Sequence, residues 1–188
     1  MSGLFLTGLV LLGACGRYLP PVPPEKVAPA TIQFISGTGD GEGFTLTWKA
    51  PDTDAQGKKL KDIEGYRIYR TEMSNLRDRG EEKQELDFAL LATVPDSHID
   101  ELRRLQADAE REGRIVRKVK IDEIKKQFSY KDKGVSTGKV YLFKVVPINN
   151  GGVEGDVQSL FRVTFNGPQS SVEQIAVSDA TQDLTFDS

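Results

Sequence analysis

The sequence is poor in cysteine and histidine, with one of each, Cys15 and His98, in 188 residues. A disulfide within the chain cannot form, and neither can a zinc site that needs two histidines. The formal net charge is only −3, from 25 Lys and Arg against 28 Asp and Glu, so no overall field attracts nucleic acid. We therefore expect no metal, no cofactor and no nucleic-acid partner, and any anion-binding surface has to be local.

The chain also lacks an apolar run long enough to span a bilayer. Residues 3–14 are apolar apart from one threonine, and a helix of that length would cover about 18 Å of a ~30 Å hydrocarbon core. Such a length is typical of the apolar region of a signal peptide. The sequence Leu12-Gly13-Ala14-Cys15 resembles the lipobox of bacterial lipoproteins. The alternative is a buried N-terminal helix or strand in which the cysteine is an ordinary core residue.

The lipoprotein resemblance implies a signal peptide over residues 1–14 and a chain that begins, after cleavage, at a diacylated Cys15. Acylation would leave no free thiol and would exclude cysteine catalysis. Residues 15–29 contain five prolines, which deny helix and favour a semi-rigid extended spacer. By the same resemblance, Gly16 after the cysteine favours the outer membrane. We expect a cell-envelope protein whose lipid anchor makes the membrane its partner, facing the periplasm or the cell surface.

Residues 30–168 have the pattern of an all-β domain. Short alternating runs such as "ATIQFIS" and "FTLTW" are separated by turns rich in Gly, Asp and Asn. Alternation places Phe44, Leu46 and Trp48 on one face of a strand. Further strands are predicted at "GYRIYR" and "FALLATV". The pattern is typical of an antiparallel β-sandwich.

Over the same residues, minus an insertion, the sequence resembles a fibronectin type III domain. The markers, in the order of that family, are Trp48 on the second strand, Tyr66 to Arg70 on the third, Gly138 to Tyr141 at the start of the sixth, and Val145 to Asn149 after it. The resemblance implies an immunoglobulin-like β-sandwich. It also implies that Tyr141 is a tyrosine corner, whose hydroxyl bonds an upstream backbone group while its ring packs.

An insertion of about thirty residues, near 97–127, separates the fourth strand from the fifth. Its first half predicts a helix, with His98 in the first turn, Ser97 as the N-cap and Gly113 as the C-cap. The apolar stripe of that helix comprises Ile99, Leu102, Leu105 and Ala109. Residues 114–121 alternate between apolar and basic side chains, which predicts an extended basic ribbon. We thus expect a helix-plus-ribbon insertion.

The basic residues of this insertion form the candidate binding site of the chain. They are Arg114, Arg117, Lys118, Lys120, Lys125 and Lys126. One interpretation is a solvated charged face around a helix that covers the edge of the sandwich. The other is a site for an anionic partner: lipid headgroups, lipopolysaccharide phosphates or an acidic protein face.

Two loops carry motif-like patterns that we interpret as structural. Asp52, Asp54 and Gly57 occupy the first, third and sixth positions of a calcium loop, but Ile63 stands where a bidentate Glu is needed. "GTGDGEG" has the glycines of a phosphate loop, yet it joins two predicted strands and precedes no helix. We expect a solvated loop and a hairpin turn.

The tail, residues 169–188, repeats the organisation of the start of the domain: a proline, an alternating strand, a polar turn and Leu184-Thr185-Phe186. It is interpreted as the start of an incomplete second fibronectin type III unit. Its apolar residues would then pack on the first domain, pair with another chain or stay disordered. The alternative is an ordinary flexible tail.

Two functions are consistent with these features. The first is a lipid-anchored, non-catalytic protein-interaction or adhesion module of the envelope, with an envelope protein as partner. The second is an accessory domain of an envelope enzyme or transport assembly that binds polysaccharide or lipopolysaccharide. In the second case Tyr66, Tyr69 or Tyr130 would stack on sugar rings.

Overall fold

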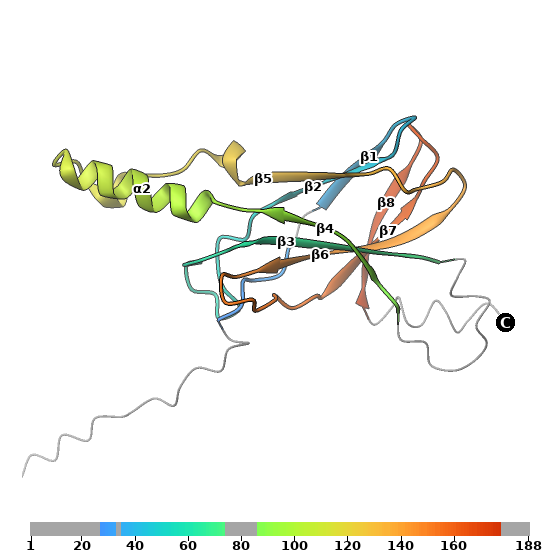
Figure 1. Ribbon diagram of the computed structural model, residues 1–188, viewed down its shortest axis with the longest axis horizontal. Helices are drawn as coiled ribbons and strands as arrows, with labels where there is room; N and C mark the ends of the chain where they lie inside the picture. Colours follow the sequence, from blue (N-terminus) through green and yellow to red (C-terminus); the bar gives the residue numbers. More distant parts are fainter. Residues whose placement is uncertain (1–26, 33–34, 74–85, 178–188) are drawn as a thin grey trace, which may run out of the picture.

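A computed structural model describes residues 27–32, 35–73 and 86–177. Cys15, most of the proline-rich segment and the second half of the tail lie outside these residues. The described strands form two antiparallel sheets, one of three strands in the order β1-β2-β5 and one of five in the order β4-β3-β6-β7-β8 (Figure 1). Their bounds are β1 (Ile35–Gly39), β2 (Phe44–Lys49), β3 (Gly65–Glu72), β4 (Ala89–Pro95), β5 (Gln127–Asp132), β6 (Val140–Ile148), β7 (Ser159–Thr164) and β8 (Ser171–Ala176).

The predicted fold class is confirmed: the two sheets form a β-sandwich with one α-helix inserted between β4 and β5. Three markers of the fibronectin type III resemblance lie where it places them. Trp48 is on β2, Tyr66 to Arg70 is on β3 and Tyr141 is on β6. The alternation on β2 is also confirmed, because every second residue from Phe44 is buried.

An aromatic cluster fills the core at the end of the sandwich from which the helix leaves. The ring centroid of Tyr66 lies 5.3 Å from that of Trp48 and 4.9 Å from that of Phe128. Trp48 and Phe128 stack on neighbouring strands of one sheet, whereas Tyr66 comes from the other. Such ring pairs contribute about 0.5–1.5 kcal/mol each beyond their buried area. The cluster therefore joins the two sheets.

Within the described residues β1 runs from Ile35 to Gly39 and takes up part of the expected turn. Gly37 permits this, since a Cβ there would lie 2.4 Å from Cζ of Phe44. The remaining turn is short. The Asp40 carboxylate closes it by accepting from the backbone N–H groups of Glu42 and Gly43. "GTGDGEG" is thus a hairpin between β1 and β2.

The inserted helix, α2 (His98–Arg111), is confirmed, and it runs away from the sandwich as a projecting arm (Figure 1). We call residues 97–126 the arm. Gly113 follows the helix with a φ of +68°, as expected of a glycine C-cap. No helix in the described part of the chain is long and apolar enough to cross a membrane.

The predicted ribbon over residues 114–121 is wrong. That segment contains a 3₁₀ turn, η2 (Val116–Lys118), and is followed by a second, η3 (Glu123–Lys126). A strand needs a neighbour to satisfy its backbone groups, and the returning segment lies along a helix instead. Ile121 is buried as the alternation predicts, but Ile115 is 51% exposed.

The first half of the tail forms strand β8, which pairs antiparallel with β7 from Ser171↔Thr164 to Ala176↔Ser159. Residues 171–176 therefore extend the sheet of the first domain. The second strand of the proposed hairpin lies outside the described residues, and the incomplete second unit stays a prediction.

The tyrosine corner is confirmed. The Tyr141 hydroxyl accepts a hydrogen bond of 2.9 Å from the backbone N–H of Ser136. The ring packs under the Arg70 guanidinium, 5.0 Å from its centroid, and Arg70 forms a 2.6 Å ion pair with Asp132 of the other sheet. These contacts close the end of the sandwich opposite the arm.

We predict that Tyr141→Phe lowers the free energy of unfolding by about 1–2 kcal/mol, because the Ser136 N–H loses its acceptor. Tyr130→Phe is the matched control: its ring packs on the same core, and its hydroxyl makes no hydrogen bond with the described residues. That control should change stability by no more than ~0.5 kcal/mol. Urea denaturation of both variants measures the difference, and equal losses would contradict the assigned role.

Candidate interaction surfaces

The arm is held to the sandwich by a buried carboxylate, Asp96. It accepts a 2.6 Å hydrogen bond from the Tyr66 hydroxyl and a 2.8 Å bond from the backbone N–H of His98. Nδ1 of His98 lies 2.8 Å from the same carboxylate. Only 3% of the His98 side chain and none of the Asp96 side chain is exposed. These contacts thus join the start of β3, the end of β4 and the start of α2.

This arrangement corrects the predicted helix cap. Ser97 occupies the N-cap position, but its side chain makes no capping hydrogen bond. The carboxylate one residue earlier accepts the first helical N–H instead. Burial, and then the charge of Asp96, raise the pKa of the Tyr66 phenol far above its ordinary value, so Tyr66 remains a donor.

Ionic contacts outside this cluster fix the base of the arm. Lys125 of η3 pairs with Glu101 of α2, and the Arg103 guanidinium donates to the backbone carbonyl of Lys61. Glu123 accepts from Lys49 of β2 and from Lys126, and these two hydrogen bonds hold the pKa of Glu123 at about 2. The base of the arm is therefore held to β2 and to the loop that follows it.

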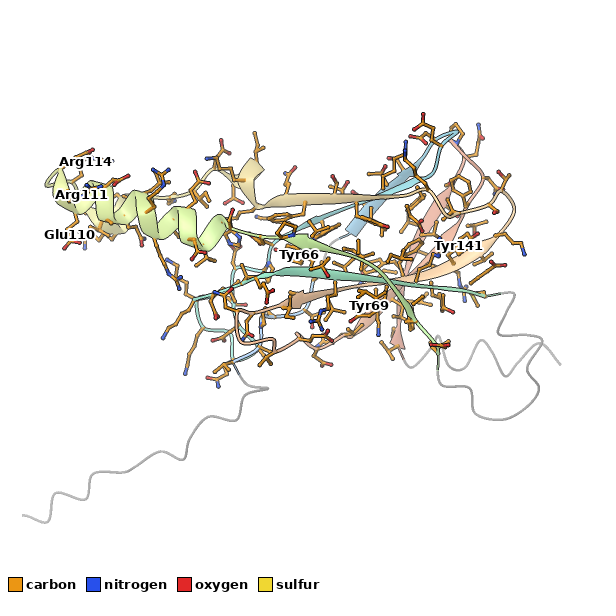
Figure 2. The ribbon with its side chains drawn as sticks, in the orientation of Figure 1. Tyr66, Tyr69, Glu110, Arg111, Arg114 and Tyr141 are labelled. Atoms are coloured by element: carbon orange, nitrogen blue, oxygen red, sulfur yellow. The ribbon has the colours of Figure 1, made fainter. Side chains whose placement is uncertain are left out.

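The tip of the arm, residues 110–120, contains a shallow hollow. It has a volume of about 550 Å³ and lies between the end of α2 and the returning segment. Figure 2 shows Glu110, Arg111 and Arg114 at this end, far from Tyr66 and Tyr141 in the sandwich. The hollow is lined by Leu105, Gly113, Arg114, Ile115, Lys118, Val119 and Lys120.

The structure brings three of the six predicted basic residues together at this hollow: Arg114, Lys118 and Lys120. Arg117 is exposed on η2 between them in sequence. The other two lie on η3 near the sandwich. Lys125 is paired with Glu101, and Lys126 with Asp52 and Glu123. The expected patch therefore divides into a tip group and a base group that is engaged within the chain.

A second surface lies on the outer face of the five-stranded sheet, which we call the sheet-face cluster. Lys144 of β6 places its Nζ 4.5 Å from the ring centroid of Tyr69 and 4.6 Å from that of Phe88. Leu90 of β4 is paired in register with Tyr69 and is 54% exposed. The cluster comprises Arg67, Tyr69, Phe88, Leu90, Lys144 and Glu154.

Polar contacts order this cluster. Glu154 accepts a 2.5 Å bond from Arg67 and a 3.1 Å bond from the Tyr69 hydroxyl. Burial, and then the negative charge of Glu154, raise the pKa of Tyr69 above its ordinary value. Alternation along the strand predicted at "GYRIYR" places Arg67 and Tyr69 on one face, but their neighbours from β4 and β6 follow only from the strand register.

The remaining sequence candidates have structural roles. Asp54 accepts from the backbone N–H groups of Gln56 and Lys58 and so orders the loop, while Asp52 pairs with Lys126 and joins the loop to the arm. Tyr66 is completely buried, and its expected stacking on sugar rings is wrong. In the described residues, no group of three or more metal-ligating side chains lies together.

No family model and no curated protein matches the sequence. The chain is similar to a solved structure, the solution structure of the third fibronectin type III domain of the human KIAA0343 protein, with 14% identity and a TM-score of 0.43. The match covers 80% of this chain and 90% of that domain. The β-sandwich described above is assigned from the strand order in its two sheets.

We predict that Asp96→Ala lowers the free energy of unfolding by about 3 kcal/mol, because it leaves the Tyr66 hydroxyl and the first N–H of α2 without acceptors. Ser97→Ala removes the side chain that the sequence favours as the cap and should cost no more than ~0.5 kcal/mol. Urea denaturation measures stability, and hydrogen exchange of the α2 amides locates the loss. A larger effect of Ser97→Ala would overturn the assignment.

Proposed function

We propose that this chain is a lipid-anchored protein of the bacterial cell envelope that acts as a non-catalytic protein-interaction module. In this proposal the anchor is Cys15, the membrane is the outer membrane, and the described β-sandwich is the module that contacts an envelope protein. The sheet-face cluster is the observation that carries the proposal.

The composition of the sheet-face cluster supports a protein partner. Tyr and Arg are enriched among residues that dominate binding energy at protein interfaces, and Tyr69 and Arg67 lie on β3, between β4 and β6. Leu90 supplies an exposed apolar side chain beside them. Because Glu154 contacts both Arg67 and Tyr69, and Lys144 contacts Tyr69, little rotamer entropy of these side chains remains to be lost on binding.

Arg67 and Tyr69 come from β3, which has a neighbour on each side in the five-stranded sheet. A site on such a strand moves less than a site on a loop. The rigidity of the sheet suits a module whose task is to hold a partner at a set distance from the membrane. The spacer sequence over residues 15–29 suits the same task.

The interaction is tested by photo-crosslinking in cells. We predict that a photoreactive amino acid at position 90 gives one discrete protein adduct, because Leu90 lies in the proposed interface. The control is the same amino acid at Lys133, an exposed residue in the turn after β5, which should give none. Absence of an adduct at position 90, combined with retention of the purified chain on polysaccharide beads, would replace this proposal with glycan binding.

The anchor is tested separately. We predict that mass spectrometry of the membrane-extracted protein shows a chain that starts at Cys15 and carries acyl groups. Cys15→Ser is the control and should retain residues 1–14 without lipid. Recovery of the unaltered chain from the soluble periplasmic fraction, with residues 1–14 intact, would contradict lipid anchoring.

A further inference from the structure

We infer that the arm tip is a second membrane contact, which binds the phosphates of anionic lipid headgroups on the membrane that carries the chain. The orientation in this inference rests on the proposed lipid anchor. The chemistry of the tip is argued from the described residues alone.

The arm and the N-terminal segment lie at the same end of the sandwich. Residues 28–30 pair with the loop after β2: Ala30 donates to the carbonyl of Thr53, and Pro29 bridges Asp54. The same loop holds the arm, since Asp52 pairs with Lys126 of η3. A chain tethered through its N-terminus therefore has the arm on the side of its tether.

The lengths are compatible with this contact. Val27 stands twelve positions after Cys15, and a proline-rich chain of that length spans at most about 37 Å. Helix α2 has 14 residues, which corresponds to about 21 Å. A semi-rigid spacer that is inclined to the membrane therefore allows the tip to reach the surface in which the anchor lies.

The tip carries cations that are available to a ligand. Arg117, Lys118 and Lys120 form no ion pair with any carboxylate in the part of the chain that the structure describes, and all three are exposed. Arg114 pairs with Glu112, with both side chains more than half exposed. Each Lys or Arg close to an anionic membrane contributes about 1 kcal/mol.

Apolar groups lie among these cations. Ile115 is 51% exposed, and Leu105 and Val119 line the hollow beside it. An exposed isoleucine flanked by Arg114 and Lys118 can enter the headgroup region while the cations remain at the level of the phosphates. This mixture matches a lipid surface, which offers anionic groups above an apolar layer.

The composition of the arm favours lipid over an acidic protein. Residues 98–126 contain no Phe, Trp or Tyr, whereas the sheet-face cluster has two aromatic rings. Protein interfaces are enriched in aromatic residues and depleted in lysine. Among the tip cations that form no ion pair within the described residues, Lys118 and Lys120 are lysines and Arg117 is the third.

The contact is tested with the full chain, extracted from membranes and reconstituted on vesicles of phosphatidylcholine alone or mixed with phosphatidylglycerol. Amide hydrogen exchange of residues 113–121 is measured on each. We expect several-fold slower exchange on the anionic vesicles, and loss of that difference at high salt, which screens exposed charges. Lys118→Gln with Lys120→Gln should weaken the contact about 30-fold and abolish most of the protection.

The matched control is Lys133→Gln with Lys139→Gln, which removes the same charge from the opposite end of the sandwich and should keep the protection. Equal exchange on neutral and anionic vesicles overturns the inference, as does protection that appears only when an acidic protein is added. If the chain carries no lipid anchor, the result is different, because the chain then does not bind neutral vesicles and remains in solution.

Discussion

The Asp96 carboxylate is the constraint on which the arrangement of this protein depends. A buried charge is tolerated only when hydrogen bonds replace its water, and here Tyr66 and His98 supply them. Since Tyr66 also packs on Trp48, the same contacts that complete the core set the direction in which α2 leaves the sandwich. Neither the aromatic cluster nor the arm can shift without disturbing the other.

This coupling explains how the two proposed surfaces keep a fixed relation. The sheet-face cluster lies on β3 and its neighbours, and β3 also carries Tyr66, with its side chain on the opposite face. The arm starts at the N-cap Ser97, directly after Asp96. A partner on the sheet and a surface at the arm tip would therefore be held at a constant separation by a short path of buried hydrogen bonds.

Much of the fold follows from the sequence because it depends on local alternation and a few distinctive residues. Phe44, Leu46 and Trp48 alternate over a whole strand, and Tyr141 needs only a backbone donor five residues upstream. The helix also follows, since its apolar stripe is local. The ribbon fails because alternation cannot reveal whether a neighbouring strand is available, and residues 114–121 pack along a helix instead.

The candidate site was less accessible to sequence reasoning. Composition identified the six cations, but the pairing of Lys125 and Lys126 depends on carboxylates that are distant in the chain, such as Asp52. The choice of Asp96 over Ser97 as the acceptor depends on Tyr66, thirty residues earlier.

The projecting arm can change in length during evolution without a change in the core. Each added turn of α2, matched by a longer returning segment, moves the tip outward by about 5.4 Å. Selection can therefore change the distance between the arm tip and the sandwich through the length of the insertion, without a change in the fold of the domain.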